Sequence, residues 1–138
     1  MAGIYGPKRH YLLDQLLDGS VEISGRGDYA LNMIYLEDIV RAICTVLDVT
    51  RTARSGVYNI VDDGPSLKAE VLAWLAQELT VPEPKFNPKI VSTRLKLRGG
   101  CMPHRYVSNS KAREQLGWKP KYPSFREGYA KLLSERIS

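Results

Sequence analysis

The sequence has few cysteines, no long apolar run and no hydrophobic segment at its start. Its 138 residues include two cysteines, Cys44 and Cys101, which is too few for the disulfide framework of a small secreted domain. Apolar runs extend over only a few residues, so a transmembrane helix and a membrane partner are not expected. The first ten residues, MAGIYGPKRH, lack the apolar core of a secretory signal. These absences favour a reducing, cytoplasmic setting.

The composition is that of an ordinary folded domain. Hydrophobic residues make up 43% of the chain and charged residues 25%, which excludes a disordered tail or a collagen-like repeat. A chain of this length can bury one core without disulfides or a structural metal. We therefore expect a single domain over residues 1–138.

Positive charge is concentrated in one segment of the chain. The formal net charge is +5, and residues 94–121 hold eight lysines or arginines and one acid, Glu114. Such a segment suits an anionic partner: a phosphate-bearing ligand, a nucleic acid or a membrane surface. The alternative is a basic face that is simply solvated.

Apolar periodicity predicts an α+β fold with about five helices. We expect helices at 8–18, 37–49, 66–80, 110–116 and from 124 towards the end of the chain. Ser66 and Asn109 are expected to cap the third and fourth of these, and Ser124 with Glu127 has the form of a capping box. β-rich runs predict short strands at 21–24, 32–36, 57–61 and 106–107, and prolines mark 82–88 as an extended linker.

Several motifs that would indicate a metal or nucleic-acid site are incomplete. Cys101-x-x-His104 offers two zinc ligands where a structural site needs four, so no metal is expected. Arg26-Gly27-Asp28 is expected to form a turn rather than an adhesion motif.

Tyr106 and Trp118 lie within the basic segment and could stack on bases. Trp118, however, follows a predicted helix end, where aromatic side chains pack on the core, which makes nucleic-acid binding an alternative of lower rank.

Six short segments follow one another in a recognisable order: GIYGP at 3–7, NMIYLEDIVRA at 32–42, GVYNIVDDGP at 56–65, VSNSKA at 107–112, LGWKP at 116–120 and YPSFREG at 122–128. Together they resemble the C-terminal half of the NAD-dependent epimerase/dehydratase family, the extended short-chain dehydrogenases, over residues 3–133. Asn32 and the 122–128 ending are more similar to an atypical, reductase-like branch. The resemblance implies a fragment of an α/β Rossmann-type protein that keeps its last sheet strand, at 57–61, and its substrate-binding lobe.

The features that carry chemistry in this family are absent from the sequence. Its members have a Gly-x-x-Gly-x-x-Gly loop for the dinucleotide and a catalytic Tyr-x-x-x-Lys pair. Gly3-Ile-Tyr-Gly6 lacks a third glycine, and none of the eight tyrosines is followed four residues later by lysine. We therefore expect no catalytic residue and no bound cofactor in this chain alone, although the family uses NAD(P).

The resemblance also indicates residues that would contact a substrate. Family arginines hold the substrate diphosphate through paired hydrogen bonds, and Arg98, thirteen residues before Lys111, matches one of them. Arg105 is the second candidate. Another family arginine is replaced here by Leu31, and a family histidine is replaced by Tyr35, which weakens the analogy with nucleotide-sugar enzymes.

Further matches lie near the substrate and the cofactor. Asn32 and Tyr35 match substrate-side positions, and Tyr5 and Pro7 match a loop near the nicotinamide. Core packing or a turn would equally explain Tyr5, Asn32 and Tyr35, and a helix cap would explain the family acid at Asp38.

The sequence thus predicts the substrate-binding portion of an NAD(P)-dependent epimerase/dehydratase or reductase-like protein, which is inactive alone. Its ligand would be a small anion, nucleotide-linked in the sugar-modifying members. The alternatives are a free-standing anion-binding or scaffold module and a basic-patch nucleic-acid binder. We also expect a homodimer or larger assembly, because an unpaired strand 57–61 and the uncovered faces of helices 37–49 and 66–80 favour association, with exchange of residues 1–18 as one route. The alternative is a monomer in which residues 1–7 fold back as a replacement strand.

Overall fold

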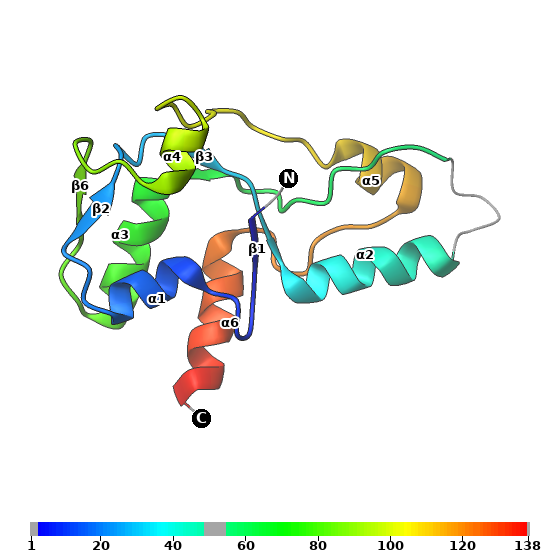
Figure 1. Cartoon of the computed structure of the whole chain (residues 1–138). Helices are drawn as coiled ribbons and strands as arrows, with labels where there is room; N and C mark the ends of the chain where they lie inside the picture. The colour runs from blue at the N-terminus through cyan, green and yellow to red at the C-terminus, as the bar shows by residue number, and fades with distance from the viewer. Residues whose placement is uncertain (1–2, 49–54, 138) are drawn as a thin grey trace. The chain divides into compact units, whose positions relative to one another are not determined.

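A computed structural model describes residues 3–48 and 55–137 (Figure 1). They fall into two compact units that alternate along the chain. Unit 1 gathers the segments Met1–Arg9, Asn32–Pro65 and Tyr106–Ser138, and unit 2 gathers His10–Leu31 and Ser66–Arg105. The single-domain expectation for 1–138 stays a prediction. The mixture of helices and short, mostly parallel strands confirms the expected fold class.

Unit 1 is built on two parallel strands and three helices. Strand β1 (Gly3–Tyr5) pairs with β4 (Met33–Tyr35) in the register Gly3↔Met33 and Tyr5↔Tyr35. The chain continues from β4 directly into α2 (Leu36–Asp48), and α5 (Ser110–Leu116) and α6 (Phe125–Ile137) complete the unit. Residue 49, the predicted end of the second helix, lies outside the described residues.

An aromatic and aliphatic core holds unit 1 together. Ile34, Ala42, Leu116 and Trp118 are buried in one cluster. A second group consists of tyrosines, in which Tyr5 stacks on Tyr129 and meets Tyr35 edge-on. Trp118 is 2% exposed, as its position after a helix end predicted, and a side chain so buried is not available to stack on bases.

Unit 2 packs two helices beside two small sheets. Helix α1 (Tyr11–Leu17) packs on α3 (Lys68–Leu79), strand β2 (Glu22–Ser24) pairs in parallel with β6 (Lys85–Asn87), and β3 (Ala30–Leu31) pairs antiparallel with β5 (Ser66–Leu67). Helix α4 (Thr93–Leu97) follows. The Arg26-Gly27-Asp28 segment forms the expected bend between β2 and β3. Gly27 has φ +69°, and a Cβ there would collide with the Phe86 ring.

The predicted strand at 57–61 is wrong. The segment has no strand ladder, and Val57 is 82% exposed. The Val57 carbonyl accepts a hydrogen bond from the Lys111 ammonium at 2.9 Å, and the Tyr58 hydroxyl bonds the Gln115 side chain at 3.2 Å. Residues 57 and 58 are therefore hydrogen-bonded to side chains of α5 and not to the backbone of another strand.

Other local expectations are corrected in the same way. Residues 106–107 form no strand, because the Val107 N–H donates to the Asn32 side chain at 2.8 Å. Ser66 lies in β5 and does not cap α3. At the N-terminus of α3 the Glu70 carboxylate instead accepts a hydrogen bond from the Leu67 N–H. The Asn109 side chain makes no cap bond. Residues 82–88 include β6, and strands β1, β3 and β5 and helix α4 were not predicted.

The C-terminal helix begins as its sequence predicted. The Ser124 N–H donates to the Glu127 carboxylate at 2.9 Å, the two side chains are hydrogen-bonded, and Ser124 Oγ accepts from the Arg126 N–H at 3.3 Å. This reciprocal arrangement satisfies donors that would otherwise be unpaired at the start of α6.

Candidate functional site

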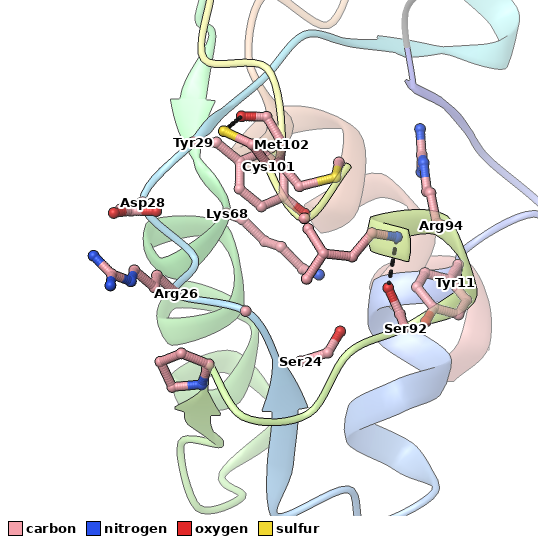
Figure 2. A pocket seen from close by; sticks show the side chains of 14 residues that line it. Tyr11, Ser24, Arg26, Asp28, Tyr29, Lys68, Ser92, Arg94, Cys101 and Met102 are labelled. Carbon is pink, nitrogen blue, oxygen red and sulfur yellow. Dashed lines mark hydrogen bonds between the residues drawn. The ribbon is translucent and has the colours of Figure 1, made fainter. Parts of the chain in front are cut away.

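A cavity of about 690 Å³ lies within unit 2 (Figure 2). Residues from α1, from the loop after β2, from the start of α3 and from the α4 region form its wall. The wall consists of Tyr11, Ser24, Gly25, Arg26, Asp28, Tyr29, Lys68, Pro88, Ser92, Arg94, Leu95, Gly100, Cys101 and Met102. The volume falls in the range of pockets that hold small molecules.

Lys68 is the buried charge of this cavity. It is the first residue of α3 and is 8% exposed. It lies three, four and seven positions before Val71, Leu72 and Leu75, which are fully buried, so it occupies the core-facing side of the helix. Its ammonium lies 5.8 Å from the centre of the Tyr29 ring.

No acid neutralises Lys68 in the described part of the chain. The ion pairs found among residues 3–48 and 55–137 do not include it. Burial lowers the pKa of Lys68, and the positive charge of Arg94 lowers that pKa further. The start of α3 adds the positive end of a helix dipole at the same place. Burial, the charge of Arg94 and the helix dipole all disfavour the protonated form of Lys68, and an anion bound in the cavity would offset all three effects.

Two arginines extend the positive character to the margins of the cavity. In Figure 2 the Lys68 ammonium points into the middle of the labelled residues, whereas the Arg26 and Arg94 guanidinium groups lie at opposite sides. The Asp28 carboxylate lies on the same side as Arg26 and is the one acid of the wall. Burial raises the pKa of the Tyr29 hydroxyl, so this group stays a neutral donor at neutral pH.

The arginines indicated by the sequence lie elsewhere in unit 2. Arg98 is the exposed residue that ends α4, and Arg105 is exposed further along the chain. Neither lines the cavity, whereas Arg94, one turn before Arg98, does. An anion-binding role for Arg98 and Arg105 stays a prediction.

Sequence reasoning missed Lys68 and Arg94 as site residues. Arg94 was counted only as part of a basic segment. Lys68 carried a readable signal, because it is a charge at a core-facing position of an otherwise apolar helix stripe.

The remaining predicted site residues belong to unit 1. Tyr5 and Tyr35 are buried with ring centres 5.4 Å apart, and burial raises the pKa of Tyr35 to about 12. Asn32 accepts the Val107 N–H, and Pro7 lies exposed in the turn between Gly6 and Arg9. The structure thus gives Tyr5, Asn32 and Tyr35 packing and hydrogen-bonding roles, and their substrate or cofactor roles stay predictions.

The residues of the GIYGP segment do not fit a dinucleotide. A cofactor loop needs a glycine whose missing side chain leaves room for the pyrophosphate. At Gly6 that space is taken by the protein itself, since a Cβ there would lie 2.8 Å from the Leu36 Cβ. Gly6 therefore allows close packing on the start of α2 rather than the approach of a phosphate.

Asp62 is a second buried charge that sequence reasoning missed. It is 3% exposed, its Oδ1 accepts the Gly64 N–H at 3.1 Å, and its Oδ2 has no hydrogen-bond partner in the part of the chain that the structure describes. Burial raises its pKa to about 7, and nearby acids, Asp63 first among them, raise it too. The ionised form of the Asp62 carboxylate therefore destabilises the folded state of unit 1.

The basic segment does not form one free positive surface. In unit 1, Arg113 pairs with Asp63 at 2.7 Å and Lys121 with Glu37 at 2.8 Å. Among residues 3–48 and 55–137 no three metal-ligating side chains cluster. No helix in these ranges combines the length and apolar character that crossing a membrane requires. Cys44 and Cys101 are exposed free thiols.

Comparisons with known proteins match almost the whole chain. A protein of unknown function from Silicibacter pomeroyi is 26% identical, with a TM-score of 0.81 over 98% of this chain and 47% of its own. A UDP-glucose 4-epimerase from Thermotoga maritima, solved with UDP-glucose, is 23% identical, with a TM-score of 0.75 over 99% of this chain and 45% of its own. A dTDP-glucose 4,6-dehydratase from Bacillus anthracis, solved with NAD, gives 20% and 0.73 over 95% and 41%.

One curated relative supports the same relationship in sequence. A 3-diazoavenalumate denitrifying reductase from a Streptomyces species is 30% identical over 135 residues, which are 91% of this chain and 43% of the reductase. No family model matches the chain. The chain spans less than half the length of each of these similar proteins. Its fold is that of part of an NAD-dependent epimerase or dehydratase.

Proposed function

We propose that the chain is the substrate-binding, C-terminal portion of an NAD(P)-dependent epimerase/dehydratase or reductase-like protein, and that it holds a small anionic substrate in the cavity of unit 2. The observation that carries this proposal is Lys68, a buried lysine that points into the cavity and has no acid partner among residues 3–48 and 55–137. A buried charge that lacks a counter-ion is costly. A bound anion removes that cost, so its binding is favoured at this place.

Similar proteins support an anionic substrate without fixing its class. The Thermotoga epimerase was solved with UDP-glucose, and the Streptomyces reductase is named for 3-diazoavenalumate. Both names denote anions. The substrate of this chain is accordingly either a nucleotide-linked anion or an organic acid.

Chemistry on that substrate needs parts that these 138 residues do not supply. The Gly-rich loop and the Tyr-x-x-x-Lys pair are absent from the sequence, and Gly6 leaves no room for a pyrophosphate. We propose that hydride transfer requires a dinucleotide-binding half outside this chain, with Tyr5 and Pro7 facing it. Arg98 and Arg105, which do not line the cavity, would contact only a part of the substrate that extends beyond it.

Association through α2 is a further part of the proposal. Leu36, Val40, Ile43 and Leu47 are between 39% and 66% exposed, and their spacing places them on one side of the helix. On α3, by contrast, Val71, Leu72 and Leu75 are fully buried, so the apolar face of this helix is not the uncovered face that the sequence predicted. We expect a homodimer through α2, which light scattering would detect, and an Ile43→Asp variant should give the 15.5 kDa monomer. A wild-type chain that is already monomeric at high micromolar concentration would contradict this.

Calorimetry on the wild-type chain tests the anion site. We expect at least one of three probes, inorganic pyrophosphate, UDP or 4-hydroxycinnamate, to bind, and Lys68→Met to weaken that binding by roughly 1.5–3 kcal/mol, the contribution of a charged hydrogen bond. Lys111→Met is the matched control, because Lys111 also lies over a tyrosine ring, that of Tyr58, but in unit 1. Equal losses in the two variants, or no binding of any probe, would contradict the proposal.

A further inference from the structure

The cavity of unit 2 combines one buried cation, Lys68, with aromatic and apolar side chains such as Tyr29, Leu95 and Met102, and this combination bears on the class of its ligand. The inference rests on the proposed function, since it concerns the same cavity. We infer that the cavity takes a small aromatic carboxylate, whose carboxylate group lies against Lys68 and whose ring lies against Tyr29 and Met102.

The charge distribution suits a single carboxylate. A lysine ammonium is a compact point charge, whereas diphosphates are bound best by the planar forks of arginines that donate paired hydrogen bonds. Here the central cation is Lys68, and the two arginines of the wall point away from the middle of the cavity (Figure 2). Arg26 lies on the same side of the cavity as Asp28, whose negative charge would oppose a second phosphate there.

The apolar part of the wall suits a ring. Tyr29 and Tyr11 present aromatic surfaces, and Leu95, Pro88 and Met102 add apolar contacts. Aromatic rings gain from stacked or edge contacts with tyrosines and from contact with methionine sulfur. Because the Lys68 ammonium lies 5.8 Å from the centre of the Tyr29 ring, a ligand that contacts both groups carries its charge within a few bonds of its ring.

The polar groups of the wall complete the fit. Ser24 and Ser92 lie on the side of the cavity opposite Tyr29 in Figure 2. Ser92 Oγ accepts the Leu95 N–H at 3.2 Å and keeps its own hydroxyl hydrogen to donate. A polar substituent on the far end of the ring, such as a hydroxyl group, could therefore be hydrogen-bonded, while the carboxylate end lies at Lys68.

The test compares matched ligands on the whole chain. Calorimetry would measure the affinity of 4-hydroxycinnamate, its neutral amide and UDP for the wild type and for Lys68→Met. We expect the carboxylate to bind at least tenfold more tightly than its amide, and this difference to vanish in Lys68→Met while a Lys111→Met control retains it. Met102→Ser should weaken the carboxylate and the amide alike, because it removes a contact with the ring.

The outcomes separate this inference from the proposed function. If UDP binds more tightly than 4-hydroxycinnamate and loses affinity in Lys68→Met, the anion site stands and the aromatic carboxylate is wrong. If no anion binds, or if binding is independent of Lys68, both fail. Equal affinity for the carboxylate and its amide also overturns the inference, because Lys68 would then not meet a charge.

Discussion

Replacing Asp38 with alanine should destabilise unit 1 by about 3 kcal/mol, because two backbone donors would lose their acceptor and each such loss costs roughly 1–3 kcal/mol. The Asp38 carboxylate is fully buried. It accepts the N–H groups of Lys121 at 2.7 Å and Tyr122 at 3.0 Å, and it also receives the Arg41 guanidinium at 2.9 Å. One carboxylate thus fastens the segment before α6 to the start of α2.

Urea unfolding of the variant would measure this effect. The matched control is the neighbouring Glu37→Ala, whose carboxylate pairs with the exposed Lys121 ammonium at 2.8 Å. An exposed ion pair contributes about 0–1 kcal/mol, and the hydrogen bond that Glu37 accepts from the Tyr122 hydroxyl at 3.0 Å contributes about 1 kcal/mol, so the control should lose clearly less than Asp38→Ala. A loss below about 1 kcal/mol for Asp38→Ala would show that the 121–122 backbone finds other partners.

Asp62→Asn should stabilise the protein above pH 7 and leave it unchanged near pH 4. The pKa of Asp62 is raised from 3.8 to about 7 in the folded chain, mainly by burial. Between these values the folded state binds a proton that the unfolded state has released, so stability falls as the pH rises through this window. A shift of this size corresponds to about 4 kcal/mol at most, and local relaxation reduces it.

Thermal melts of both proteins at intervals from pH 4 to pH 9 would test this expectation. Asparagine keeps the shape of the side chain and removes the charge, so the difference in stability between variant and wild type should widen steadily up to about pH 7 and then level off. Glu78→Gln serves as the control, because Glu78 is an exposed acid of unit 2 and is not among the charges that shift the pKa of Asp62. A constant difference across the range would mean that Asp62 does not titrate in this window.

Local patterns predicted the helices well because helical periodicity and caps depend on near neighbours. The apolar stripe of α2 and the Ser124–Glu127 capping box are encoded within a few residues, and both form as expected. The error at 57–61 has the opposite cause. A β-rich run becomes a strand only when a distant segment supplies a ladder, and here the Lys111 and Gln115 side chains meet it instead.

The site was harder to predict than the fold for a related reason. The family resemblance and the basic segment indicated Arg98, with Arg105 as the second candidate, and both are exposed. The cavity instead uses Lys68 and Arg94, from segments that are far apart in sequence and meet only in the folded unit 2. A charged residue on a buried helix face was the signal available, and it is a local one.

The most direct test of the account is where an anion binds, and amide NMR of the labelled chain answers it. A bound probe, UDP or 4-hydroxycinnamate, should shift the amide signals of Tyr29, Lys68 and Met102, which surround the cavity of unit 2, and these shifts should disappear in Lys68→Met. Signals of Lys111, which bonds the Val57 carbonyl, and of Arg113 and Lys121, which form ion pairs in unit 1, should remain in place. Shifts confined to residues 111–121, with the cavity signals unmoved, would contradict the account.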